Sequence, residues 1–277
     1  MGYLFDPDNW RWLFSGNNFL FLLRGFWINV QIALVAMVLS LTIGLALALL
    51  RVSTRRVMSA VAGVWVDVWR NLPLIFIILY LFLVMPEPWR DAYERWVPEW
   101  FPTAFQSPFF LAAVIGLTLY NSAVIAEIMR AGIVSLERGQ GEAAASIGLR
   151  HWQAMRLVIL PQGLRRMVPA TVSQLITLNK DTTLVSIIGI QEVMRHARIV
   201  SATSGSPFTG TGVEAPLLQV FLAVGIMFVI VNLTLSRLSR RLEVRERRRT
   251  GVEVEKVVGV EDQLALSEAA ASPAQPR

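Results

Sequence analysis

The chain has 277 residues, of which 54% are hydrophobic and 17% are charged, and its mean hydropathy is +0.51. This composition excludes an ordinary soluble domain and predicts an integral membrane protein, because several apolar runs reach the roughly 20 residues that cross about 30 Å of hydrocarbon. The absence of cysteine excludes disulfides, thiol catalysis and cysteine metal sites. His151 and His196 have no second metal-binding group at ligand spacing, so no metal site is predicted.

Five membrane-spanning helices are predicted, in an all-α polytopic fold. Their approximate bounds are Phe26 to Leu50, Val57 to Val84, Pro108 to Met129, Met167 to Ile190 and Pro216 to Ser236. A kink or break is expected in the second span near Arg70-Asn71-Leu72-Pro73, because a proline inside a helix removes a hydrogen bond and clashes with the preceding turn. Lys180-Asp181 interrupts the fourth span.

The distribution of basic residues predicts how the spans are oriented. Eighteen of the 26 Lys and Arg residues lie in one set of alternate flanks, and only six lie in the other. The richer set is 51–60, 130–167 and 237–277, and the poorer set is 1–25, 85–107 and 191–215. Because cytoplasmic flanks carry an excess of Lys and Arg, the N-terminus is expected outside and the C-terminus in the cytoplasm. The excess of basic residues is thus explained by the orientation of the chain in the membrane. For this reason no nucleic acid partner is expected.

The two ends of the chain are predicted to lie outside the spans. Residues 1–25 are expected to form an external interfacial segment, since they contain the aromatic side chains that collect at membrane interfaces. They lack the basic start and apolar core of a cleavable signal peptide. Residues 244–277 begin with a basic cluster and end in Ala, Ser, Pro and Gln, which predicts a disordered cytoplasmic tail able to contact anionic membrane lipid.

The connection between the third and fourth spans is the most informative segment. From Leu136 to Gln162 it is too polar to span a membrane and too long for a simple turn. Glu142 to Ala145 is a favourable helix start, with a carboxylate near the positive end of the helix dipole, and Gly148 is expected to end that helix. A second helix is expected from Trp152 to Ile159, ended by Pro161. This helix–glycine–helix element would form a compact protruding surface that a soluble partner protein could bind.

The spacing of this loop resembles the EAA motif of ABC importer permeases. The matching residues are Glu142, Ala143, Ala144, Gly148, Val158, Leu160 and Pro161, with valine where the family usually has isoleucine. Other stretches resemble the polar amino-acid uptake branch: Arg70 to Leu74, Leu119 to Ile128, Lys180 to Ser186 and Leu235 to Glu243. Region 116–202 is most similar to glutamate permease subunits. The resemblance implies a transmembrane domain over 26–243, with the EAA loop at about 137–165.

The same resemblance implies the partners and the location. The short helix is expected to dock into a groove of a separate ABC ATPase dimer, where Glu142 meets a basic group and Gly148 permits the close turn. A second permease subunit, identical or related, and an extracytoplasmic solute-binding protein complete a complex in the bacterial inner or cytoplasmic membrane. This chain has no Gly-x-x-x-x-Gly-Lys-Ser/Thr phosphate loop, so it is expected to be a transport subunit without catalytic residues or cofactor. ATP and Mg²⁺ are expected in the ATPase.

Polar side chains inside the spans are candidates for the substrate pathway or for gating, because charges in a bilayer usually face the bundle interior, a partner or water. Ser173, Thr177 and Lys180 are spaced i, i+4 and i+7, so they share one helical face, with Gln174 and Asp181 beside it. The pathway candidates are Tyr120, Asn121, Ser173, Gln174 and Thr177. A structural or gating role is expected for Arg70, Pro73, Glu127, Lys180 and Asp181.

Several alternatives stay open at this level. Lys180 and Asp181 could pair with each other or with a neighbouring helix, while Tyr120 and Asn121 could line the pathway or hydrogen-bond between helices. Glu127 is three residues from Arg130, which favours an interfacial ion pair. Glutamate is the leading substrate, and glutamine, histidine and arginine are alternatives. An ion-coupled secondary transporter is less favoured because internal repeats are not evident, and a membrane enzyme lacks a convergent catalytic set.

Overall fold

The structure is a computed structural model, and it describes residues 6–136, 138–202 and 215–250. Those ranges are helical and contain no strand, as expected for an all-α fold. In chain order the elements are η1 (Pro7–Trp10), α2 (Arg11–Phe14), α3 (Asn18–Arg51), α4 (Arg56–Asn71), α5 (Leu74–Val84), α6 (Glu87–Trp96), α7 (Thr103–Gln106), α8 (Pro108–Val134), α9 (Arg138–Ser146), α10 (His151–Ala154), η2 (Met155–Ile159), α11 (Leu160–Asp181), η3 (Thr182–Ile188), α12 (Val193–Ala202) and α13 (Leu217–Thr250).

Three helices of the described chain are long and apolar enough to cross a membrane: α3, α8 and, over Leu217–Arg245, α13. The pair α4 and α5 becomes a fourth candidate if it is counted as one broken span, with a bend of 96° between the two helices. The predicted fourth span corresponds to α11 and η3, and it is absent from this set. Its polar residues, among them Gln174, Lys180 and Asp181, lower its hydropathy.

The predicted break in the second span is confirmed. Helix α4 ends at Asn71, and Leu72 takes an extended conformation with ψ of 136° before α5 starts at Leu74. Proline disfavours a helical conformation in the residue before it, which explains why the helix stops there. The side chain of Asn71 donates to the Asp67 carbonyl oxygen at 2.6 Å and satisfies one of the acceptors left at the helix end.

The helices extend beyond the predicted spans at both ends, and the disorder predicted for the start of the tail is wrong. Helix α3 begins at Asn18, within the segment 1–25 that was assigned to the membrane surface, because the apolar run Phe19–Leu23 extends the helix outward. The Asn18 side chain also donates to the Trp12 carbonyl oxygen at 2.8 Å. At the other end, α13 continues to Thr250, so the start of the predicted disordered tail is helical. The remaining tail, 251–277, lies outside the described residues.

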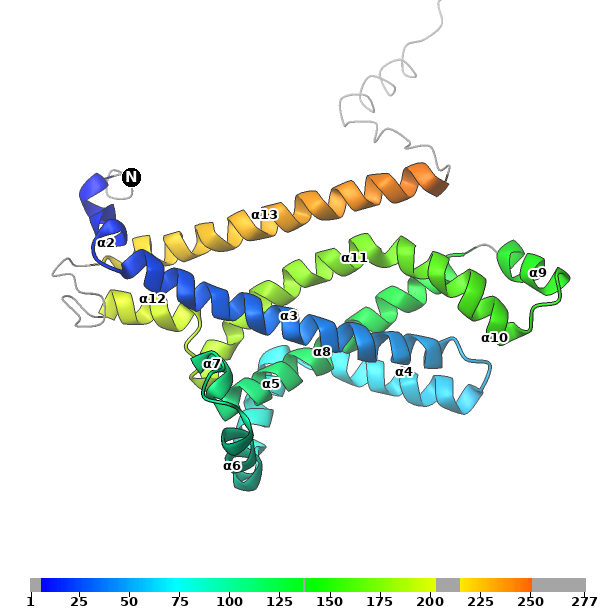
Figure 1. Ribbon diagram of the computed structural model, residues 1–277, viewed down its shortest axis with the longest axis horizontal. Coiled ribbons are helices and arrows are strands. Elements are labelled where there is room, and N and C mark those ends of the chain that lie inside the picture. The colour runs from blue at the N-terminus through cyan, green and yellow to red at the C-terminus, as the bar shows by residue number, and fades with distance from the viewer. Residues whose placement is uncertain (1–5, 137, 203–214, 251–277) are drawn as a thin grey trace, which may run out of the picture.

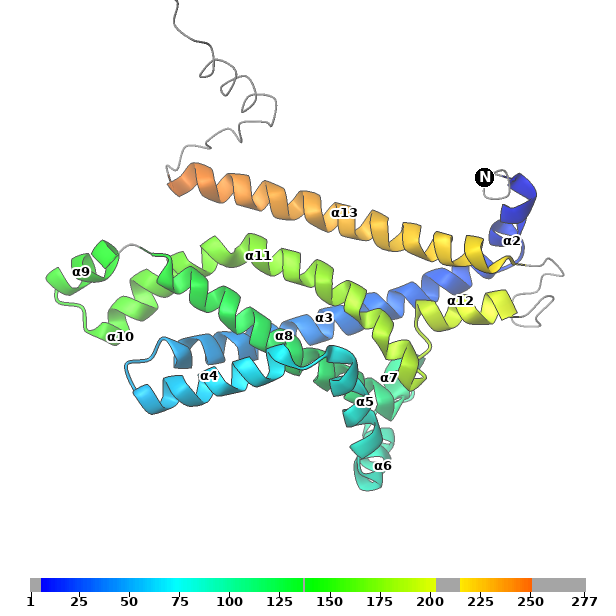
Figure 2. The same cartoon turned by 180° about the vertical axis from the view of Figure 1, so that it is seen from behind.

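Helix α3 is the centre of the bundle and packs along α8 (Figures 1 and 2). Buried apolar side chains such as Ile32, Leu117 and Leu178 form the main core between α3, α8 and α11. A second core joins α12 to α3 and α13, and includes Leu22 and Val193. Helix α12 was not predicted, since 191–215 was assigned as an outer connection. Helices α9 and α10 lie at the end of the molecule opposite α2 and α12.

Candidate functional site

The predicted helix–glycine–helix element is present at one end of the bundle, and Gly148 does end its first helix (Figure 1). The Leu149 N–H donates to the Ala144 carbonyl oxygen at 3.1 Å, and the Gly148 N–H donates to the Ala145 carbonyl oxygen at 2.9 Å. This is the bonding pattern of a Schellman motif. Its C′ residue must be left-handed, and Gly148 has φ of +83°. The glycine therefore determines the angle at which α9 meets α10.

The prediction that Pro161 ends the second helix is wrong. Helix α10, the π-helical turn η2 and α11 follow one another without a break from His151 to Asp181, and Pro161 lies in the first turn of α11. At this point the Leu160 N–H donates to the Met155 carbonyl oxygen, five residues back. Proline interrupts a helix because it lacks an N–H and its ring meets the carbonyl group of the preceding turn. The wider π-helical turn accommodates both effects, and the helix continues.

The surface of this element combines one carboxylate with three exposed apolar side chains. Glu142 is exposed and forms no ion pair within the described part of the chain. Ile147, Trp152 and Leu157 are 76%, 63% and 62% exposed. Exposed apolar side chains gathered on a small element are typical of an interaction site. We call these four residues the coupling surface. The sequence analysis missed its apolar members, although three large apolar residues in a polar loop were a usable signal.

The other EAA-motif residues differ in burial, and a hydrogen bond between neighbouring side chains attaches this element to the bundle. Ala143 is exposed, whereas Ala144 is buried and faces inward; Leu160 is partly buried. The side chain of Gln162 donates to Gln140 Oε1 at 3.2 Å and so connects α11 to α9. The loop is thereby tied to the helix that leads into the bundle.

Helices α8 and α11 cross in close contact immediately behind the coupling surface. A Cβ atom on Gly132 would lie 2.8 Å from the Gly163 carbonyl oxygen and 2.1 Å from Met167 Cγ. A Cβ atom on Gly163 would lie 3.1 Å from Ile133 Cα. Both glycines are therefore required for the close approach of the two backbones.

The predicted pathway residues lie where α8, α11 and α13 meet. Gln174 Nε2 donates to Asn121 Oδ1 at 2.7 Å and joins α11 to α8. The Ser173 hydroxyl lies 3.3 Å from the Ser239 hydroxyl and joins α11 to α13. Of the two alternatives for Asn121, the structure contains the hydrogen bond between helices. Tyr120 packs at the edge of the main core.

The predicted polar face of α11 is open to its surroundings. Ser173 and Lys180 are exposed, and Thr177 is partly buried one turn from each. Neither Lys180 nor Asp181 forms an ion pair with any residue that the structure describes, so neither pairing considered from the sequence is present among those residues. Ser173 and Lys180 leave this face partly exposed, although the Ser173 hydroxyl also contacts Ser239.

Glu127 and Arg51 join α8, α3 and α4 through a chain of ion pairs. Glu127 forms the predicted ion pair with Arg130, with Nε 3.0 Å from Oε2, and a second ion pair with Arg51 of α3. Asp67 of α4 lies 3.9 Å from the same Arg51 guanidinium. Arg70 and Pro73, the other predicted structural residues of this region, are exposed at the break between α4 and α5.

A buried polar network links α3 to the start of η3 and to the turn before α12, and the sequence analysis did not identify it. Asn29 Nδ2 donates to Thr182 Oγ1 at 3.0 Å and to Glu192 Oε2 at 2.9 Å. Asn29 Oδ1 accepts from the Val193 N–H at 3.0 Å. Asn29, Thr182 and Glu192 are fully buried. The network fixes the turn into α12, and an asparagine inside an apolar span was its only sequence signal.

The described chain is thus all-helical, with apolar candidate spans, polar contacts between its helices and an exposed helix–glycine–helix element at one end. The chain belongs to the family of binding-protein-dependent transport system inner membrane components, which matches residues 22–248. It is an ABC-importer permease of the polar amino-acid branch, as predicted from the EAA loop and from the other stretches that resemble this branch.

Several relatives cover nearly the whole domain. The chain is 36% identical over 235 residues to the probable glutamine ABC transporter permease protein GlnP of Bacillus subtilis (strain 168), covering 84% of this chain and 97% of that protein. It is 30% identical over 225 residues to the glutamate/aspartate import permease protein GltK of Escherichia coli O157:H7, covering 81% and 93%. It is also 30% identical over 239 residues to the glutamate transport system permease protein GluD of Corynebacterium glutamicum, covering 86% and 80%.

Solved structures have the same fold. An amino acid ABC transporter crystallised with histidines aligns with a TM-score of 0.63 and 27% identity, over 81% of this chain and 94% of that one. The inward-facing methionine transporter MetNI aligns with a TM-score of 0.58 and 18% identity, over 80% of this chain and 96% of that one. The second match supports the fold alone.

Proposed function

We propose that this chain imports glutamate or glutamine, powered by a separate ABC ATPase dimer that binds the coupling surface. The main observation in support is the coupling surface, where the Glu142 carboxylate, which forms no ion pair with the described residues, lies among exposed apolar side chains at one end of the bundle. Such a combination suits a protein groove with one basic group. ATP and Mg²⁺ would bind the ATPase, and ATP-driven closure of that dimer would move the docked element.

The proposed topology has five spans in the bacterial inner or cytoplasmic membrane. They are α3, the broken pair α4 and α5, α8, the pair α11 and η3, and α13. The charge asymmetry of the flanks supports an outer N-terminus and a cytoplasmic coupling surface. A polar fourth span is compatible with a bilayer when its polar face meets a second permease subunit, identical or related, rather than lipid. That subunit and a solute-binding protein complete the proposed complex.

The open face of α11 supports the proposed substrate class. Ser173, Thr177 and the cation of Lys180 suit an acidic or neutral side chain better than a cationic one. Relatives named for glutamine and for glutamate/aspartate add to this reasoning. Asn121 and Gln174 would place a neutral amide pair next to that face.

The docking proposal is tested by Glu142→Lys, with Glu99→Lys as a control that reverses an exposed carboxylate in the connection between α6 and α7. In proteoliposomes with the ATPase and binding protein, Glu142→Lys is expected to abolish ATP-driven uptake and to reduce ATPase co-purification, while membrane insertion stays normal. Wild-type uptake and co-purification for this variant would disprove the docking contact.

The substrate is tested separately, in vesicles that hold the wild-type complex. Uptake of labelled glutamate is measured in competition with unlabelled glutamate, glutamine, arginine and histidine. Glutamate or glutamine is expected to compete most strongly. Stronger competition by arginine or histidine would show that the proposed substrate class is wrong.

A further inference from the structure

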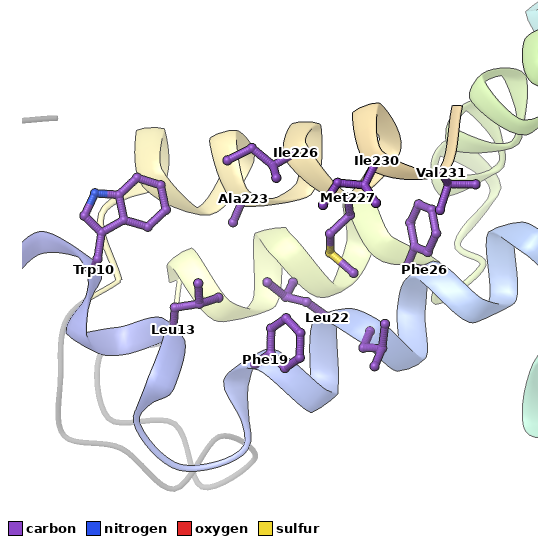
Figure 3. Close-up of a pocket in the computed structure, with 11 residues that line it drawn as sticks. Trp10, Leu13, Phe19, Leu22, Phe26, Ala223, Ile226, Met227, Ile230 and Val231 are labelled. Atoms are coloured by element: carbon purple, nitrogen blue, oxygen red, sulfur yellow. The ribbon is translucent and has the colours of Figure 1, made fainter. Parts of the chain in front are cut away.

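Two adjoining apolar cavities lie on the side of the bundle formed by α3 and α13, away from the coupling surface. The first, of about 300 Å³, lies between the two helices and is closed at one end by Trp10 and Leu13 (Figure 3). The second, of about 770 Å³, lies along α3 and shares Leu23, Phe26 and Val231 with the first as a common wall. Both volumes are within the range of about 300–1,000 Å³ that ligand sites occupy.

The first cavity lies between two helices that the proposed topology places in the membrane. It is bounded by two helices that are apolar enough to span a bilayer, and Ile226 and Ile230 on its rim are partly exposed. An apolar cavity in contact with the hydrocarbon of a membrane is filled by hydrocarbon, because an empty void loses dispersion contacts. An acyl chain is therefore the occupant whose chemistry fits.

The second cavity has a cation on its wall. Arg24 lines it, is exposed, and forms no hydrogen bond or ion pair with any other described residue. An unpaired arginine beside apolar spans is costly unless it reaches an anion in the headgroup layer. Its planar guanidinium matches the oxygen geometry of phosphate.

We propose that the two cavities bind one diacyl phospholipid, with its phosphate on Arg24 and its two chains on either side of the wall formed by Leu23 and Phe26. A second copy of this chain fits less well, because neither cavity is lined by a carboxylate that could pair with Arg24. The topology proposed above places this lipid in the outer leaflet. The binding site itself does not depend on which end of the chain is outside, or on the substrate.

The proposal is tested by native mass spectrometry of the full-length chain, released into mild detergent from nanodiscs of palmitoyl-oleoyl phosphatidylglycerol. The key variant is Leu23→Trp, which places a larger side chain on the wall that the two cavities share. Its matched control is Leu34→Trp, on the same helix with similar exposure, 48% against 43%, and outside both linings. Wild type and Leu34→Trp are expected to retain one phospholipid per chain, and Leu23→Trp about tenfold less, because the indole would occupy space beside Phe26 that the acyl chains need.

Three further variants separate binding from folding and identify the headgroup contact. Leu23→Ala widens the cavities and is expected to keep the lipid, whereas Arg24→Gln is expected to weaken retention and Arg24→Lys to restore part of it. Equal retention by Leu23→Trp and Leu34→Trp, or no lipid on the wild type, would overturn the site. Unchanged retention by Arg24→Gln would overturn the phosphate contact.

A competing occupant is tested by cross-linking. The chain has no cysteine, so Ile226→Cys introduces a single thiol at the rim of the first cavity. Under oxidation in native membranes, no dimer cross-linked through this residue is expected. A disulfide between two copies would identify the second copy as the occupant and would overturn the lipid proposal.

Discussion

Replacing Gly148 with alanine isolates the backbone conformation of the turn between α9 and α10. An added Cβ at this position meets no atom within 4 Å, so the substitution creates no steric clash. The remaining cost is that of an L-residue at φ of +83°, about 1–2 kcal/mol. That energy corresponds to a factor of about 5–30 in the population of the turn.

Gly139→Ala is the matched control. Gly139 lies in α9, and an added Cβ there also meets nothing within 4 Å, but its φ is not positive. Alanine is expected to stabilise this helix by about 0.5–1 kcal/mol relative to glycine. Gly148→Asn is expected to fall between wild type and Gly148→Ala, because asparagine tolerates the left-handed region better than alanine does.

Hydrogen exchange at the Leu149 amide measures the effect directly, since this N–H is bonded to the Ala144 carbonyl oxygen. We expect exchange about 5–30 times faster in Gly148→Ala than in wild type, and no acceleration in Gly139→Ala. Uptake in the reconstituted complex should fall in the same order. Wild-type exchange in Gly148→Ala, or equal acceleration in both alanine variants, would refute the reasoning.

Thermal unfolding in detergent tests two further contacts. Glu127→Ala removes two ion pairs and leaves Arg51 without its closer partner, so we expect Tm to fall by about 2–8 °C. Asp67→Ala should lower Tm less, because its carboxylate is 3.9 Å from Arg51 and more exposed. An equal fall in the two variants would contradict this ranking. Gly132→Ala forces apart the two crossing helices and should destabilise the fold by about 1–3 kcal/mol, which lowers Tm by several degrees. Gly63→Ala should not lower Tm, because an added Cβ there meets nothing within 4 Å. Equal Tm values for the two variants would show that the crossing is not tight.

Features that depend on local chemistry were predictable from the sequence. Pro73 breaks the second span and Gly148 ends α9, because each residue imposes its own backbone geometry. Pro161 does not follow this rule, because the π-helical turn before it allows the helix to continue through the proline. The length of α3 was underestimated because the apolar run before Arg24 was assigned to the membrane surface.

Features that depend on contacts between distant segments were not predictable. The hydrogen bond between Gln174 and Asn121 joins residues 53 positions apart, and the sequence indicated only that both are polar and intramembrane. The network of Asn29, Thr182 and Glu192 requires α3 and the start of α12 to be adjacent. Helix α12 itself was missed because a short amphipathic helix after a charged turn resembles an external connection.

The helix is continuous from α10 through η2 to α11, so the coupling surface lies at one end of a long helical path. At about 1.5 Å per residue, the path from His151 to Asp181 is roughly 45 Å long. A tilt of about 10° at the π-helical turn would move the Lys180 end of α11 by roughly 6 Å, given the length of that helix. Under the proposed function, a small tilt imposed on the coupling surface would therefore become a displacement of several ångströms at the polar face of α11.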